Sequence, residues 1–175
     1  SQFQDLGEGE TRDVSFSYTV TDDSGEGNAV SAAQTVTITV TGTNDQPVAT
    51  AGITGAATED GPAVTGNLTV ASDVDVSNVA DTHTFQLASG TSEGSITIDP
   101  ATGIYTFTPG SQFQDLGEGE TRDVSFSYTV TDDSGATDGS AVSAAQTVTI
   151  PSPSPICRCR RSALIRCAST PYHHT

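Results

Sequence analysis

Apolar and polar residues alternate along most of the chain with the two-residue period of β-strands. In residues 13–20, DVSFSYTV, every second residue is apolar and the residues between are serine or threonine, apart from the leading Asp13. Valine and isoleucine alternate with threonine in the same way in residues 34–40, QTVTITV. No window of eleven or more residues has the spacing of an amphipathic helix. The pattern therefore predicts half-buried antiparallel strands.

Turn residues divide this pattern into short segments. Residues 95–108, SITIDPATGIYTFT, predict a hairpin, because proline suits the second position of a turn and Gly103 can adopt positive φ. We expect seven strands at residues 48–56, 63–71, 83–88, 94–99, 103–108, 123–131 and 142–150. Seven short strands at this spacing predict an all-β fold, a Greek-key β-sandwich of the immunoglobulin type.

The chain contains a long internal repeat. Residues 1–25 recur letter for letter at 111–135, and AVSAAQTVTI occurs at 29–38 and again at 141–150. A period of 110–112 residues is that of whole domains in tandem. We assign three parts: the last two strands of an upstream repeat, one complete repeat, and an unrelated tail, at residues 1–43, 44–150 and 151–175. The two upstream strands have no sheet to cover their apolar face, so we expect them to be poorly ordered or wrongly docked.

The tail differs from the rest in composition. After the first AVSAAQTVTI the chain continues TVTGTND, but after the second it continues PSPSPICRCRR. Thr-Val-Thr codons read one base late give Pro-Ser-Pro, so we interpret residues 151–175 as a frame-shifted, disordered tail. Its Cys157, Cys159 and Cys167, with His173 and His174, match no standard zinc spacing.

The charge of the chain is strongly negative. Residues 1–150 hold all 22 acidic residues and only two arginines, a net charge of −20, whereas the tail holds four arginines and no acid. Such a body repels phosphate backbones, which argues against nucleic acid as a partner and makes cations the natural counter-charge. No apolar run reaches the length of a membrane helix, so we expect no membrane insertion.

The acidic residues gather in the loops at the two ends of the predicted sandwich. The incoming end has Asn44-Asp45, Asp73, Asp75 and Asp132-Asp133, and the outgoing end has Glu59-Asp60, Asp115, Glu118 and Glu120. Clustered carboxylates repel unless a cation neutralises them, and Ca²⁺ accepts six to eight oxygen ligands in irregular loops. Aspartate is also a common turn former, which is the alternative explanation. We favour calcium for Asp45, Asp73 and Asp75 taken together.

Several of these segments, in this order, resemble the VCBS repeat and the related bacterial cadherin-like domain. They are GTNDQP, ATEDGP, DVDVSNVADTHTF, GSITIDPATGIYTFTP and VSFSYTVTDDSG. The resemblance implies large multi-repeat, RTX-type surface adhesins exported by type I secretion, in which calcium stiffens the junctions between repeats. It implies Asn44 and Asp45 as linker ligands, Asp73 and Asp75 as a loop pair, Glu59 as a ligand at the far end, and Asp133 as a further ligand.

We therefore expect a non-enzymatic, calcium-stabilised repeat module of a bacterial cell-surface or secreted adhesin. It would serve as a rigid spacer and in cell adhesion, with neighbouring repeats and host or biofilm glycans or proteins as partners. The alternative is a carbohydrate-binding β-sandwich, for which Tyr105 and Phe107 are the aromatic residues to inspect. The G-x-S-x-G match at residues 90–94 is followed by a predicted strand instead of the helix that a hydrolase nucleophile needs.

Overall fold

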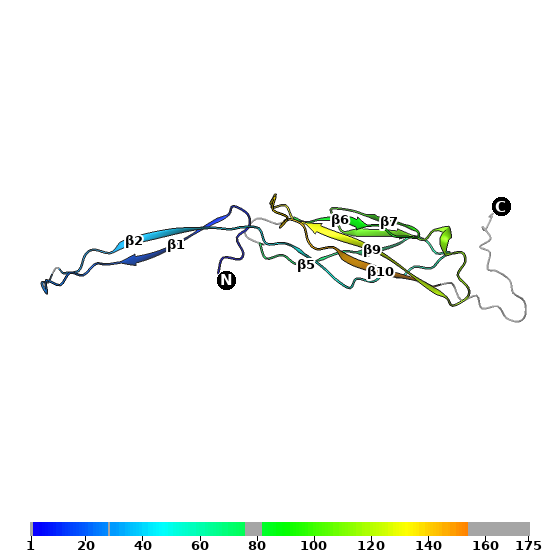
Figure 1. Ribbon diagram of the computed structural model, residues 1–175, viewed down its shortest axis with the longest axis horizontal. Helices are drawn as coiled ribbons and strands as arrows, with labels where there is room; N and C mark the ends of the chain where they lie inside the picture. Colours follow the sequence, from blue (N-terminus) through cyan, green and yellow to red (C-terminus); the bar gives the residue numbers. More distant parts are fainter. Residues whose placement is uncertain (1, 28, 76–81, 154–175) are drawn as a thin grey trace, which may run out of the picture. The chain divides into compact units, whose positions relative to one another are not determined.

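The computed structural model describes residues 2–27, 29–75 and 82–153, and its regular secondary structure consists almost entirely of strands (Figure 1). One 3-10 turn, η1 (Ser111–Phe113), interrupts them in this part of the chain. The strands are β1 (Thr11–Tyr18), β2 (Gln34–Thr41), β3 (Val48–Ala49), β4 (Val64–Asn67), β5 (Val70–Ser72), β6 (Thr84–Ser89), β7 (Ser95–Ile98), β8 (Ile104–Thr108), β9 (Thr121–Thr131) and β10 (Gln146–Pro153).

The chain divides into two compact units, which we describe separately. The hairpin unit comprises residues 1–46, 73–82 and 132–141, and the sandwich unit comprises residues 47–72, 83–131 and 142–175. The acidic loops 73–75 and 132–138 thus belong to the same unit as β1 and β2.

The sandwich unit is a β-sandwich with antiparallel sheets of order β10-β9-β6 and β4-β8-β7, together with the pair β3-β5. Tyr105 on β8 packs against Phe126 on β9 at 5.2 Å between ring centroids, which joins the two larger sheets face to face. Alternate residues of β9, from Val124 to Val130, point into this core because side chains alternate across a strand. The expected all-β sandwich is confirmed.

The hydroxyl group of Tyr128 connects two segments at the edge of the core. It lies 2.9 Å from the carbonyl oxygen of Thr50 and 3.1 Å from that of Thr69, and its single proton is shared between them. Thr69 lies between β4 and β5, where one expected strand at 63–71 is broken into two short ones. The break lets β4 pair with β8 while β5 pairs with β3.

The last strand continues beyond the point where the sequence predicts that it ends. β10 runs through Pro151 and Pro153, paired with Asp123 and Thr121 of β9, whereas we expected the strand to stop at Ile150 and disorder to follow. The carbonyl of Pro151 accepts a hydrogen bond from Ala57 N, on the side away from β9. The missing N–H groups of both prolines therefore face away from β9, and that ladder is preserved. The rest of the tail, with its cysteines and histidines, lies outside the described residues.

The hairpin unit contains the paired strands β1 and β2 (Figure 1). Their register, from Thr11 opposite Thr41 to Tyr18 opposite Gln34, is regular over eight residues. It reproduces the register of β9 and β10, where Thr121 faces Pro153 and Tyr128 faces Gln146. The backbone of the upstream strands is therefore regular, in contrast to the poor order that we expected.

Candidate functional site: an acidic cluster around residues 42–45

A tight backbone contact holds the segment after β2 against the loop before β1. Gly42 N donates to the carbonyl of Glu10 at 2.8 Å, and Gly9 N donates to the carbonyl of Gly42 at 3.2 Å. A Cβ atom on Gly42 would lie 2.5 Å from the carbonyl oxygens of both Leu6 and Gly7. Only glycine fits here, so the first residue of GTND is explained by close approach of the backbone.

Asn44 brings two carboxylates to this segment. Its backbone N–H donates to Glu8 Oε2 at 3.1 Å, and its side-chain Nδ2 donates to Asp132 Oδ2 at 3.0 Å. Asp132 is buried, and its other oxygen accepts hydrogen bonds from the backbone and hydroxyl of Ser134. Asn44 thus bridges the loop before β1 and the loop after β9.

Asp45 and Asp75 add a third loop to the cluster. The N–H of Asp45 donates to Asp75 Oδ2 at 2.5 Å. Asp75 Oδ1 is buried and has no hydrogen-bond partner, although a buried carboxylate oxygen normally has one. Gly7 lies against Asp75, since a Cβ built on it would be 3.8 Å from Asp75 Cβ. An acceptor atom is therefore available at the point where the three loops meet.

The electrostatics of the cluster are unfavourable in the absence of a cation. Burial raises the pKa of Asp75, and the negative charges of Asp45, Asp73 and Asp132 raise it further, while the hydrogen bond from Asp45 N lowers it. Among the described residues of the hairpin unit the cationic side chain is that of Arg12, and it is bound to Asp5 at 2.7 Å. This arginine is therefore engaged outside the cluster.

The groups that converge here carry oxygen donors, but the described residues do not form a metal site. In residues 2–27, 29–75 and 82–153, no three His, Cys, Asp or Glu side chains are close enough together to hold a metal ion. The groups that do converge carry oxygen donors, as Ca²⁺ prefers, and include the unpartnered Asp75 Oδ1.

The hairpin unit contains five of the six predicted ligands, all but Glu59. Asp45 N contacts Asp75 and Asn44 contacts Asp132, but no three carboxylates among the described residues are close enough together to hold a metal ion. Asp133 is exposed and accepts a hydrogen bond from the Thr82 hydroxyl at 2.8 Å. Its neighbour Asp132 is the residue that reaches Asn44. Glu59 belongs to the sandwich unit, in the loop before β4.

Sequence reasoning assigned no ligand role to Asp132 or Glu8, yet both carboxylates bind Asn44. Strand parity could have identified Asp132, because it continues the inward-facing series of even-numbered residues in β9. The repeat does place Glu8 at this junction, because it corresponds to Glu118 of the outgoing end, but its partner Asn44 lies 36 positions away and is found only in the structure.

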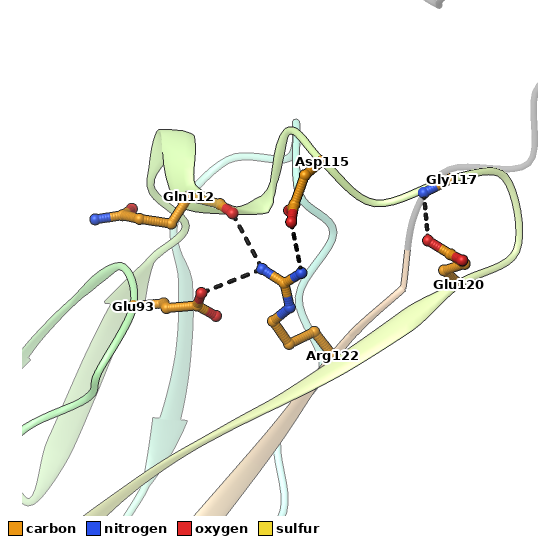
Figure 2. A network of polar contacts seen from close by, with 6 residues as sticks. All are labelled: Glu93, Gln112, Asp115, Gly117, Glu120 and Arg122. Atoms are coloured by element: carbon orange, nitrogen blue, oxygen red, sulfur yellow. Dashed lines mark hydrogen bonds and ion pairs between the residues drawn. The ribbon is translucent and has the colours of Figure 1, made fainter.

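An arginine fixes the loop before β9 in the sandwich unit (Figure 2). Arg122 Nη1 donates to Glu93 Oε1 and to the carbonyl of Gln112, each at 3.1 Å, and Nη2 donates to Asp115 at 3.0 Å. Gly117 N donates to Glu120 Oε2 at 2.7 Å.

The identical loop of the hairpin unit is held in the same way. Arg12 binds Asp5 and the carbonyl of Gln2, and Gly7 N donates to Glu10. This shape presents Glu8 to Asn44. Glu118 occupies the equivalent position in the second copy of the loop.

Tyr105 and Phe107, the aromatic residues of the carbohydrate-binding alternative, are 2% and 0% exposed. Both belong to the core of the sandwich, because they alternate inward along β8. Neither presents a face to a sugar ring, so these residues do not support that alternative. Residues 90–94, G-x-S-x-G, are followed directly by β7.

Comparison with known proteins finds one matching family model, the bacterial cadherin-like domain, over residues 44–151. No curated protein sequence matches the chain. Among the described residues no helix is long and apolar enough to cross a membrane.

Similar solved structures are extracellular domains 1–4 of protocadherin gamma B7 (TM-score 0.50, 17% identity, 83% of this chain and 32% of that one) and domains 22–24 of mouse cadherin-23 (TM-score 0.44, 16% identity, 87% and 44%). The chain thus spans less than half the length of either. The first of these supports the fold alone.

Proposed function

Because the chain belongs to the bacterial cadherin-like domain family, we propose that it is a calcium-stabilised repeat module of a bacterial surface or secreted adhesin. Domains of this family are generally non-enzymatic and extracellular, and they typically bind calcium. In this proposal each repeat acts as a spacer whose angle to its neighbour is fixed by bound ions. The neighbouring repeats are its first partners, and host or biofilm glycans or proteins are its adhesive targets.

The observation that carries the proposal is the convergence of three loops on residues 42–45. The loops contribute Glu8, Asp75 and Asp132, and the hydrogen bonds of Asn44 and Asp45 connect them. A cation bound by Asp45, Asp73, Asp75 and Asp132, with Glu8 as a further ligand, would remove the repulsion that raises the pKa of Asp75. It would also supply the missing partner of Asp75 Oδ1.

Both copies of one loop carry the glutamate that such a site would use. The loop before β1 delivers Glu8 to the linker that enters the complete repeat. The loop before β9 holds Glu118 at the same position, ready for the linker of a following repeat. Glu59 and Asp60 lie in the same unit as that loop, and Asp60 accepts a hydrogen bond from Gln114 in it at 2.8 Å.

The test is thermal unfolding of the full chain, followed by circular dichroism, in calcium and in chelator at equal ionic strength. Extracellular calcium modules bind with Kd of roughly 0.1–1 mM. Saturation at about 10 mM calcium then stabilises the folded state by roughly 1.4–2.7 kcal/mol. Magnesium should act more weakly, because it requires octahedral geometry and retains its water. An unfolding temperature that is the same in calcium and in chelator would refute the proposal.

Two adjacent aspartates provide a matched pair of variants. Asp132→Asn keeps an acceptor for Ser134 but loses both the charge and the acceptor oxygen that face Asn44, and it should reduce the calcium response. Asp133→Asn changes an exposed carboxylate that contacts Thr82 and should retain the response. Equal calcium responses in the two variants would place the ion elsewhere.

A further inference from the structure

An arginine of β1 holds the loop of residues 2–10 in place. Arg12 donates to both carboxylate oxygens of Asp5, from Nη1 at 3.1 Å and from Nη2 at 2.7 Å, and Nη1 also donates to the carbonyl of Gln2 at 3.1 Å. Two parallel hydrogen bonds from a guanidinium fix the orientation of a carboxylate as well as its distance. The first half of the loop is therefore tied to the strand that follows it.

The second half of the loop closes on itself. Gly7 N donates to Glu10 Oε2 at 3.0 Å, and Glu10 N donates to the carbonyl of Gly7 at 3.1 Å. Between them Gly9 has a φ of 74°, which glycine adopts without strain. This turn contains the side chain of Glu8 and the N–H of Gly9, and both contact the segment after β2.

The second copy of the loop has the same hydrogen bonds, although a different segment follows its hairpin. Gly117 N donates to Glu120 Oε2 at 2.7 Å, and Glu120 N donates to the carbonyl of Gly117 at 3.0 Å. Arg122 binds Asp115 at 3.0 Å (Figure 2). After β10 the chain reads SPIC, whereas after β2 it reads GTND. The shape of the loop therefore comes from its own residues and its arginine.

Residues 42–45, which we call the linker segment, bind to this loop through three hydrogen bonds. Gly42 N donates to the carbonyl of Glu10, and the carbonyl of Gly42 accepts from Gly9 N. Asn44 N donates to Glu8 Oε2. All three donors are backbone N–H groups and all three acceptors are oxygens of the chain itself. These contacts therefore need no bound ion.

We propose that Arg12 is a positioning residue for the linker segment: it holds the loop in the shape to which residues 42–44 bind, with or without a cation. The two are coupled, because the groups that bind Gly42 and Asn44 all belong to the turn of residues 7–10. The proposal goes beyond calcium binding, since it assigns part of the order of the linker segment to the protein's own hydrogen bonds. A cation at the acidic cluster would then meet a linker segment that is already in place.

Amide hydrogen exchange of the full chain, measured by NMR in chelator, tests the proposal. The reporters are the N–H groups of Gly9, Gly42 and Asn44, each of which joins the loop to the linker segment. Arg12→Gln should accelerate exchange at all three by about two- to fivefold, the factor expected for loss of a solvent-exposed ion pair. The amides of β1 and β2 should keep the rates of the parent, because the two strands pair through their own ladder. Chelator removes calcium, so this result is independent of the thermal test of the proposed function.

Arg122→Gln is the matched control, since it breaks the equivalent ion pair in the sandwich unit and should leave the three reporters unchanged. Gly42→Ala displaces the linker segment directly, because a Cβ atom there would lie 2.5 Å from two carbonyl oxygens of the loop. Adding Arg12→Gln to Gly42→Ala should then accelerate exchange at Gly9 and Asn44 no further, since both changes act through one contact.

Four results would overturn the proposal. Unchanged reporters in Arg12→Gln would show that the arginine does not act on the linker segment. Equal acceleration in the two arginine variants would show a general loss of stability. Acceleration of the β1 and β2 amides to the same extent would show that Arg12 holds the hairpin instead. Additive effects of Arg12→Gln and Gly42→Ala would show that the two residues act independently.

Discussion

Ser152 of β10 and Val40 of β2 are equivalent residues of the two hairpins, and the serine is fully buried with an Oγ that has no hydrogen-bond partner. The inward-facing series of β10, Val148 and Ile150, thus ends on a polar atom. A buried hydroxyl without a partner costs about 1–3 kcal/mol of stability.

Removing this hydroxyl should stabilise the sandwich unit. Ser152→Ala is expected to raise the free energy of unfolding by about 1 kcal/mol, because it deletes the unsatisfied Oγ without adding volume. Ser152→Val introduces the residue that β2 has at the equivalent position 40. It should raise the free energy of unfolding further where the site has room for its two methyl groups. Urea denaturation measures both effects. A less stable alanine variant would show that Oγ makes a hydrogen bond in solution.

The two equivalent tyrosines should respond differently to loss of their hydroxyl groups. Tyr128→Phe removes the hydrogen bond to the carbonyls of Thr50 and Thr69 and should lower the free energy of unfolding by about 1–2 kcal/mol. Tyr18→Phe changes a half-exposed side chain and should leave it within about 0.5 kcal/mol of the parent. Urea denaturation at low protein concentration compares them, and equal losses would contradict the assigned contacts.

Alternation of apolar residues was sufficient to predict the fold, because sheet faces follow directly from the two-residue period. It could not distinguish β1 from β9, since the sequences are identical and burial of Phe16 or Phe126 depends on whether other strands cover them. The break of one expected strand into β4 and β5 depends likewise on pairing with two different partners. Proline in β10 is tolerated for a tertiary reason, the orientation of its nitrogen away from β9.

Part of the acidic cluster could be predicted from the topology of the sandwich. Loops at one end of a sandwich converge, so Asp45, Asp73 and Asp75 could be grouped from the topology alone. The choice of Asp132 over Asp133 required strand parity, which local sequence does provide. The contact of Glu8 with Asn44 joins an upstream loop to the linker and is visible only in three dimensions.

Arg122 should control the titration of Asp115. The hydrogen bond from Arg122 holds the pKa of Asp115 below its ordinary value. An aspartate with a lowered pKa stabilises the folded state above its ordinary pKa, and this contribution is lost as the pH falls through the folded-state pKa. Arg122→Gln should therefore raise the pKa of Asp115 towards its ordinary value, as followed by NMR of the side-chain carboxyl carbon. Arg12→Gln is the matched control, since it should shift Asp5 and leave Asp115 unchanged.

Asp75 should have opposite effects with and without calcium. Asp75→Asn removes a charge that burial and the neighbouring aspartates disfavour, so in chelator the variant should be more stable than the parent. Its side-chain oxygen can still accept the hydrogen bond from Asp45 N. In saturating calcium the order should reverse, because the variant loses a charged ligand. Thermal unfolding in the two buffers measures both differences. The exposed Asp23→Asn substitution is the control and should change neither. A variant less stable than the parent in both buffers would mean that Asp75 serves the fold of its loop and not a cation.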